Sequence, residues 1–149
     1  KKTVTFAGAT DGAWGHGAGA RDPGTLFVVT GLVYASVIAV CTTDTEGAGS
    51  TDEVGITGAT AIFMPITTMT NLEAGEIWFN SATPATYTIT GGATPADRIP
   101  AEYLLNGSDI IMLTKTADTD SGVVDFYCIW RPVSTDGDVR ASTVAEEAP

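Results

Sequence analysis

The longest apolar run of the chain covers residues 26–41, LFVVTGLVYASVIAVC, and it is apolar at both odd and even positions. A strand with one face in water alternates apolar and polar side chains, so this run predicts a strand that is buried on both faces. The run is longer than a usual strand, and we expect Gly31 to divide it by a bend or a bulge.

The two sides of this predicted strand differ in size. The even side is bulky and suits the core of a β-sandwich; it carries Leu32, Tyr34, Ile38 and Val40. The odd side is small and suits close approach by a second sheet or a neighbouring subunit. The odd positions that we assign to a subunit interface are Val33, Ala35, Val37 and Ala39.

A membrane-spanning helix is the alternative for residues 26–41. It needs about 20 mostly apolar residues. This run is shorter, is interrupted by Thr30, Gly31 and Ser36, and is rich in β-branched residues, which favour strands. We therefore predict a buried strand and no membrane partner.

Shorter strand patterns follow along the chain. We expect strands at 54–56 and 61–66 around a turn at Gly58, with Pro65 either placing the second of them at a sheet edge or ending it. Further strands are predicted at 76–80 and at 85–90, where the alternation is clean. Asn106-Gly107 marks a tight turn, and the strongest hairpin pattern pairs 109–114 with 123–130.

Some eight short strands with turns every eight to twelve residues predict an all-β fold, a single-domain antiparallel β-sandwich that is jelly-roll-like. We place this domain at residues 25–140. It is preceded by an extended N-terminal arm, residues 1–24, and followed by a flexible C-terminal tail, residues 141–149. The 17 glycines and 7 prolines agree with a fold of strands and turns.

The net charge of −11 makes free nucleic acid a poor partner, because an acidic surface repels phosphate groups. The sequence predicts no enzyme, because no catalytic, cofactor-binding or metal-binding constellation assembles around the lone His16.

Cys41 and Cys128 are either two buried free thiols or a disulfide. The acidic loop 44–53 lacks the spacing of a calcium loop, so a solvated loop is the default there. Trp78 and Trp130 fit the core better than a sugar-binding platform.

The arm concentrates basic residues in an acidic protein and contains Trp14, a large side chain with little beside it to pack on. Two interpretations remain open. The arm either lies over its own domain, or it grips a partner with Trp14 as the anchor. Its start, KKTVTFAGAT, lacks the apolar region of a signal peptide.

The blocks GTLFVVTGLVYASVIAVCTTD, NLEAGEIWFN and NGSDIIMLTKTADTDSGVVDFYCIWRPVSTDGDV resemble small β-rich virion structural proteins of tailed bacteriophages. The resemblance spans about residues 24–139. Its most specific pieces are the segments 74–78, 109–111 and 126–132, which shape the fold and form no active site. The N-terminal 23 residues lie outside it.

The resemblance implies a capsid decoration, or cement, protein. Such a subunit binds the major capsid protein on the outer surface of the head, as a homo-trimer, and opposes the pressure of the packaged DNA. It would reside in the virion after assembly in the host cytoplasm. The candidate capsid contacts are Lys1, Lys2, Trp14 and Arg21. The alternatives are a glycan-binding or host-surface-binding sandwich, and a tail or neck component.

Overall fold

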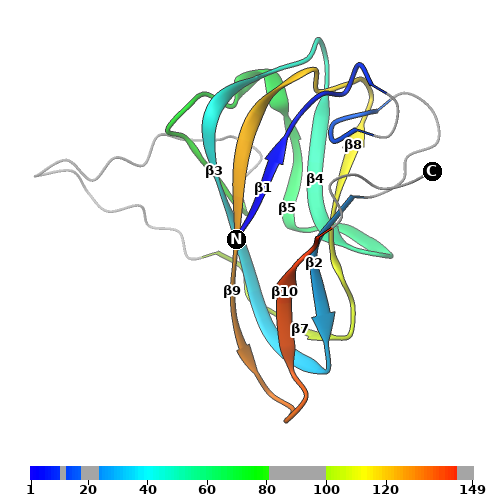
Figure 1. The fold of residues 1–149 in the computed structure, drawn as a ribbon, viewed down its shortest axis with the longest axis vertical. Helices are drawn as coiled ribbons and strands as arrows, with labels where there is room; N and C mark the ends of the chain where they lie inside the picture. Colours follow the sequence, from blue (N-terminus) through cyan, green and yellow to red (C-terminus); the bar gives the residue numbers. More distant parts are fainter. Residues whose placement is uncertain (11–12, 18–23, 81–99, 144–149) are drawn as a thin grey trace, which may run out of the picture.

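Two antiparallel β-sheets pack face to face in this computed structural model, which describes residues 1–10, 13–17, 24–80 and 100–143 (Figure 1). Sheet A has the order β1-β9-β3-β6, with β7 also paired to β3, and sheet B has the order β10-β2-β8-β4-β5. The strands of sheet A are β1 (Lys2–Thr5), β3 (Leu32–Glu46), β6 (Ile77–Trp78), β7 (Tyr103–Asn106) and β9 (Ser121–Pro132). Those of sheet B are β2 (Gly24–Thr30), β4 (Thr51–Ile56), β5 (Ala59–Thr68), β8 (Ile110–Lys115) and β10 (Asp138–Ala141). One 3-10 turn, η1 (Met69–Asn71), follows β5. The predicted all-β sandwich is confirmed.

The long apolar run divides at Gly31, as predicted. β2 ends at Thr30, β3 begins at Leu32, and Gly31 between them has a φ of 59°, a backbone conformation that favours glycine. The two halves then enter different sheets, so the break carries the chain across the sandwich. Among the described residues, no helix has both the length and the apolar character that crossing a bilayer requires.

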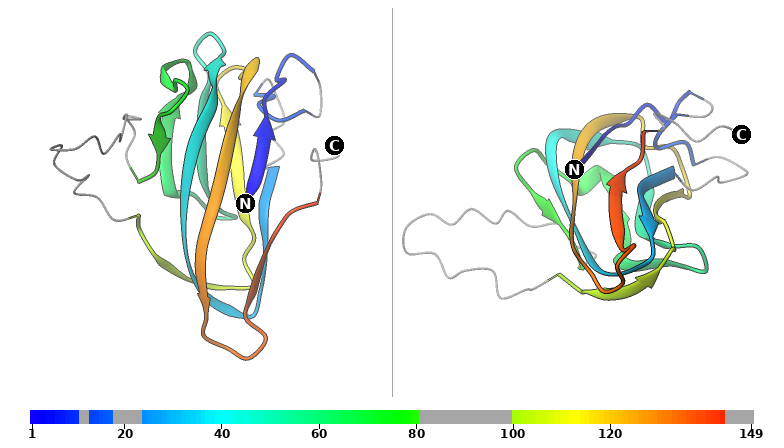
Figure 2. Two further views of the ribbon diagram at one scale, coloured as in Figure 1. Left: turned by 60° about the vertical axis from the view of Figure 1, so that its left-hand side comes forward. Right: turned by 60° about the horizontal axis from the view of Figure 1, so that its bottom comes forward.

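β3 and β9 are the long central strands of sheet A and run side by side over nearly their whole lengths (Figure 2). Their register pairs Val33 with Pro132 at one end and Glu46 with Ser121 at the other. On its other edge β3 pairs with β7 near its start and with β6 near its middle. This central position covers both edges of β3.

The small side of β3 faces the core between the two sheets, so of the two neighbours that we considered for it, the second sheet is the one found. The bulky side, which we assigned to the core, points outward instead. Val33, Ala35, Val37 and Ala39 are 0–1% exposed and belong to the core of their own chain. A side chain without exposed surface cannot contact another subunit, so the predicted subunit interface at these four residues is wrong in this fold.

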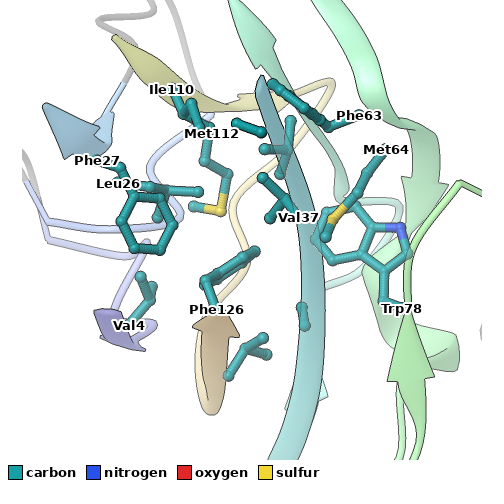
Figure 3. Close-up of a cluster of buried hydrophobic side chains, with 14 of the residues drawn as sticks. Val4, Leu26, Phe27, Val37, Phe63, Met64, Trp78, Ile110, Met112 and Phe126 are labelled. Atoms are coloured by element: carbon teal, nitrogen blue, oxygen red, sulfur yellow. The ribbon is translucent and has the colours of Figure 1, made fainter. Parts of the chain in front are cut away.

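Large neighbours explain why the inward side chains of β3 are small. Ala39 lies between Trp78 on β6 and Phe126 on β9, and the two rings meet edge to face with their centroids 6.0 Å apart (Figure 3). Ala35 likewise lies between Tyr103 and Trp130. A larger residue at either position would displace these rings, because protein cores are close-packed.

The predicted hairpin of 109–114 with 123–130 is wrong, although both strands exist. β8 pairs with β2 and β4 in sheet B, whereas β9 pairs with β1 and β3 in sheet A, so the connection between them crosses from one sheet to the other. Near the predicted end of the domain at residue 140, β10 pairs with β2 from Asp138 to Ala141. By contrast, Gly58 turns between β4 and β5 as predicted. β5 continues past Pro65 to Thr68 and is an edge strand, so Pro65 marks the edge of the sheet and not the end of the strand. The predicted strand at 85–90 lies outside the described residues.

The start of the predicted arm is part of the sandwich. β1 pairs with β9 in sheet A, and residues 13–17 are fixed to the loop before β9 by backbone hydrogen bonds: the Gly8 amide donates to the Thr119 carbonyl and the Thr119 amide donates to the Gly15 carbonyl. Trp14 is 9% exposed and belongs to the hydrophobic core. Of the two interpretations of the arm, packing over its own domain holds for these residues, and Trp14 is not the exposed partner anchor that we considered.

Candidate functional site

The outward side of sheet A carries an apolar surface, which we call the outer apolar face. Because the odd residues of β3 point into the core, its even residues point out, and residues opposite them on neighbouring antiparallel strands point the same way. The apolar side chains that this register gathers are Tyr34, Ile38, Val40, Ile77, Leu104, Tyr127 and Ile129. Leu104 is 51% exposed and Ile129 is 57% exposed, while the other five are half-buried.

Two ion pairs flank the outer apolar face. Lys1 Nζ lies 2.6 Å from Asp125 Oδ2, and Arg131 Nη2 lies 3.1 Å from Glu102 Oε2. Both cations also lie near aromatic rings of the face: Lys1 Nζ is 5.8 Å from the Tyr127 ring centroid and the Arg131 guanidinium is 4.3 Å from that of Tyr34. The four formal charges sum to zero on a chain whose net charge is −11. The outer apolar face is therefore electrically balanced where the whole chain is strongly acidic.

The charged neighbours shift one another's titration. Hydrogen bonds from Lys1 and Thr3 lower the pKa of Asp125, and the hydrogen bond to Asp125 raises the pKa of Lys1. The hydrogen bonds and charge of Glu102 raise the pKa of Arg131. All three groups are therefore ionised at neutral pH, and the charges around the face persist there.

The predicted capsid contacts do not gather at one place. Lys1 lies at the border of the outer apolar face. Lys2 instead donates a hydrogen bond from Nζ to the Ser142 carbonyl and lies 5.7 Å from the Trp14 ring centroid. Trp14 is in the core, and Arg21 lies outside the described residues. Of the four residues, only Lys1 is placed beside the surface that could receive a partner.

The potential nucleophiles and the histidine lie apart and are held by structural contacts. Burial raises the pKa of the Cys41 thiol to about 11 and that of the Cys128 thiol to about 12, and both cysteines are free. Such thiols carry almost no thiolate at neutral pH, so they act as small apolar side chains. His16 Nδ1 is 2.7 Å from the Gly8 carbonyl oxygen, an acceptor, so this nitrogen carries the proton and donates. Each of these residues serves the fold.

The acidic side chains of loop 44–53 do not come together as a cation-binding site would require. Asp44 accepts a hydrogen bond from the Ala74 amide, while Asp52 and Glu53 lie in β4 and are buried. The solvated loop that we expected is therefore wrong for its last two acids. In residues 1–10, 13–17, 24–80 and 100–143, no three His, Cys, Asp or Glu side chains come together as metal ligands would.

A hollow of about 500 Å³ lies beside β1 and is lined by Lys2, Thr3, Thr5, Ala7, Ala13, Trp14 and Thr143. Its lining includes the ring of Trp14, an aromatic side chain of the kind that the glycan-binding alternative needs. The ring of Trp14 is packed into the core and has Lys2 over it, so it offers no open stacking surface. Trp78 is fully buried as expected, whereas Trp130 is 36% exposed and is not a core residue.

The described residues form an all-β sandwich, and the outward side of its sheet A carries the outer apolar face. No protein-family model, no curated protein and no solved structure matches this chain.

Sequence reasoning missed the outer apolar face although the signal was present. Residues 26–41 are apolar on both sides, which indicated burial of both, and the bulkier side was assigned to the core. The missing information was the identity of the neighbours, since Trp78 and Phe126 fill the interior beside Ala39 and leave Ile38 and Val40 to the outside.

Proposed function

We propose that this chain is a non-enzymatic structural protein that docks through the outer apolar face onto a larger assembly, and that the assembly is the head of a tailed bacteriophage. In this role the chain is a decoration, or cement, protein that binds the major capsid protein and stabilises the capsid. It resides on the capsid surface of the virion and in the host cytoplasm during assembly.

The observation that carries this proposal is the exposed apolar surface of sheet A. Seven apolar side chains share this face, and two of them, Leu104 and Ile129, are more than half exposed. Proteins in water rarely leave such an apolar patch open unless it meets a partner. The balanced charges of Lys1, Asp125, Glu102 and Arg131 suit an interface, because no uncompensated charge has to be removed from water.

The remaining acidic surface supports the same role. A net charge of −11 keeps free subunits apart in the cytoplasm before they add to a head. The sandwich supports it too, since the outer apolar face lies on strands whose opposite sides form the core, so the docking surface is rigid.

The test is addition of the purified protein to undecorated heads. Wild-type protein should co-sediment with the heads in a fixed stoichiometry and raise the temperature at which they release DNA. Leu104→Lys places a charge on the outer apolar face without touching the core, and should weaken binding by about tenfold or more, which corresponds to at least about 1.4 kcal/mol.

Val28→Lys is the matched control. Val28 is 41% exposed and lies on β2 in the other sheet, so this variant should bind as the wild type does. Failure of the wild type to bind heads, or equal binding by the Leu104 and wild-type proteins, would refute the proposal. Particles that fail to form at all without the protein would indicate a tail or neck component instead.

A further inference from the structure

Sheet B holds a carboxyl group in the interior at a position that cannot move. Asp52 is fully buried, and its carboxyl oxygen Oδ1 has no hydrogen-bond partner among the described residues. The backbone of Asp52 pairs with Thr67 of β5 on one side and with Thr114 of β8 on the other. Because both ladders fix this strand, water can reach the carboxyl group only if the residues that cover it move.

The cover of Asp52 has two layers. Thr119, in the loop between β8 and β9, is fully buried, and its hydroxyl donates to Asp52 Oδ2 at 3.1 Å. Above it lies the N-terminal segment: the Gly8 amide donates to the Thr119 carbonyl, and the Thr119 amide donates to the Gly15 carbonyl. The approach is close, since a Cβ on Gly8 would lie 2.7 Å, and one on Gly15 2.5 Å, from the Thr119 carbonyl oxygen. Thr119 therefore joins the buried carboxyl group to the N-terminal segment.

This cover is held less firmly than the strand beneath it. Residues 6–10, 13–17 and 116–120 belong to no strand, and single backbone hydrogen bonds connect them. Separating such segments breaks fewer hydrogen bonds than separating paired strands, so the cover can open while both sheets stay intact.

Burial, and not a neighbouring charge, is what raises the pKa of Asp52 from 3.8 to about 7, and the hydroxyls of Thr114 and Thr119 oppose it. β5 carries no ionisable side chain. The ionisable side chains of the other elements around Asp52 make contacts with one another or are exposed. They are Glu53 and Lys115, which pair at 2.7 Å, His16 and Asp118, which lie 3.5 Å apart, and Glu46 and Asp120, which are exposed.

We propose that the Asp52 carboxyl group is a pH-dependent latch for the N-terminal segment. With its proton, the carboxyl group keeps Thr119, and the backbone at Gly8 and Gly15 above it, in place. Loss of the proton favours a locally opened form, in which Thr119 and the N-terminal segment separate from the sandwich and water reaches the carboxylate.

The direction of the pH effect follows from the two states of Asp52. The closed form keeps the proton up to about pH 7, whereas the opened form, in which water surrounds the carboxyl group, loses it near 3.8. The closed form is therefore favoured at low pH, and this advantage is lost as the pH rises to about 7. Over this range the equilibrium constant for opening should rise about tenfold per pH unit, or about 1000-fold in all.

Amide hydrogen exchange of the full chain tests the latch at the Gly8 and Thr119 amides. Relative to the intrinsic exchange rate, exchange of both should accelerate about tenfold per pH unit between about pH 4 and pH 7 in the wild type. In Asp52→Asn, whose side chain does not titrate, the ratio should stay constant. Asp118→Asn is the control: it removes the charge beside His16 while the amide oxygen can still accept from the Gly17 amide, so it should respond to pH as the wild type does.

Low concentrations of guanidinium separate opening of the cover from unfolding of the whole sandwich. At pH 7, exchange of the Gly8 and Thr119 amides should not respond to them, because local opening exposes little surface, whereas the slowest amides between β3 and β9 should accelerate. Equal acceleration of both groups, or wild-type protection that does not change with pH, would overturn the proposal. So would a pH response that persists in Asp52→Asn or disappears in Asp118→Asn. The inference stands apart from the proposed function, because its test needs no phage head.

Discussion

Asp52 offers the sharpest test of the core, because a carboxyl group lies where water does not reach. It is in the middle of sheet B, on β4 between Thr67 of β5 and Thr114 of β8, and its side chain is on the core side with that of Val54. The Thr119 hydroxyl donates to Oδ2 at 3.1 Å, while Oδ1 has no hydrogen-bond partner among the described residues. Burial raises the pKa of Asp52 from 3.8 to about 7, and the hydroxyls of Thr114 and Thr119 offset this only in part.

This shift makes the fold less stable as the pH rises. The folded chain keeps the Asp52 proton up to about pH 7, while the unfolded chain loses it near 3.8, so the folded state binds more protons in between. Stability is therefore fully present below the unfolded pKa and is lost as the pH rises to about 7. The shift of about 3 units corresponds to about 4 kcal/mol at about 1.4 kcal/mol per unit.

Asp52→Asn removes the titration and nearly keeps the shape of the side chain. The amide oxygen still accepts from Thr119, so the variant should match the wild type below about pH 3.8. Above that pH it should exceed the free energy of unfolding of the wild type by an amount that grows to about 4 kcal/mol at about pH 8. Denaturant titrations across this pH range measure the difference. Asp120→Asn, an exposed acid in the same loop as Thr119, is the control for lost charge and should follow the wild type. A difference between the Asp52 variant and the wild type that does not change with pH would refute this account.

Two further predictions concern the turn at Gly31 and the thiols. Gly31→Ala should lower the free energy of unfolding by about 3 kcal/mol, because φ at this residue is 59° and a Cβ would lie 2.7 Å from both Asp136 Oδ1 and Ser134 Oγ. The control Gly49→Ala, where φ is 79° and a Cβ meets no atom within 4 Å, should lower it by only about 1 kcal/mol. Denaturant titration measures both. Equal costs would show that the contact at Gly31 does not matter. In the folded protein, Cys41 and Cys128 should react with a thiol reagent at pH 8 at least about 100-fold more slowly than free cysteine, because burial raises the pKa of both thiols. After unfolding in guanidinium both should react fully. Rapid reaction of either thiol in the folded protein would contradict its buried position.

The sequence alone determined the kind of fold and the places where the chain breaks. The β-branched run, the clean turn signals and the lack of helical periodicity predicted an all-β sandwich, which is what two antiparallel sheets form. Gly31 and Gly58 were found correctly because their backbone conformations are local requirements that few other residues meet. Pro65 was placed at an edge for an equally local reason, its missing N–H.

Only the tertiary structure decided which strands are partners and which side of β3 is inside. β8 and β9 have the pattern of a hairpin, yet each makes its hydrogen bonds in a different sheet, because pairing depends on strands distant in sequence. A run that is apolar on both sides carries no information about its orientation. The rings of Trp78 and Phe126 settle it, since they leave room between them only for Ala39, and the bulkier residues of β3 then form the outer apolar face.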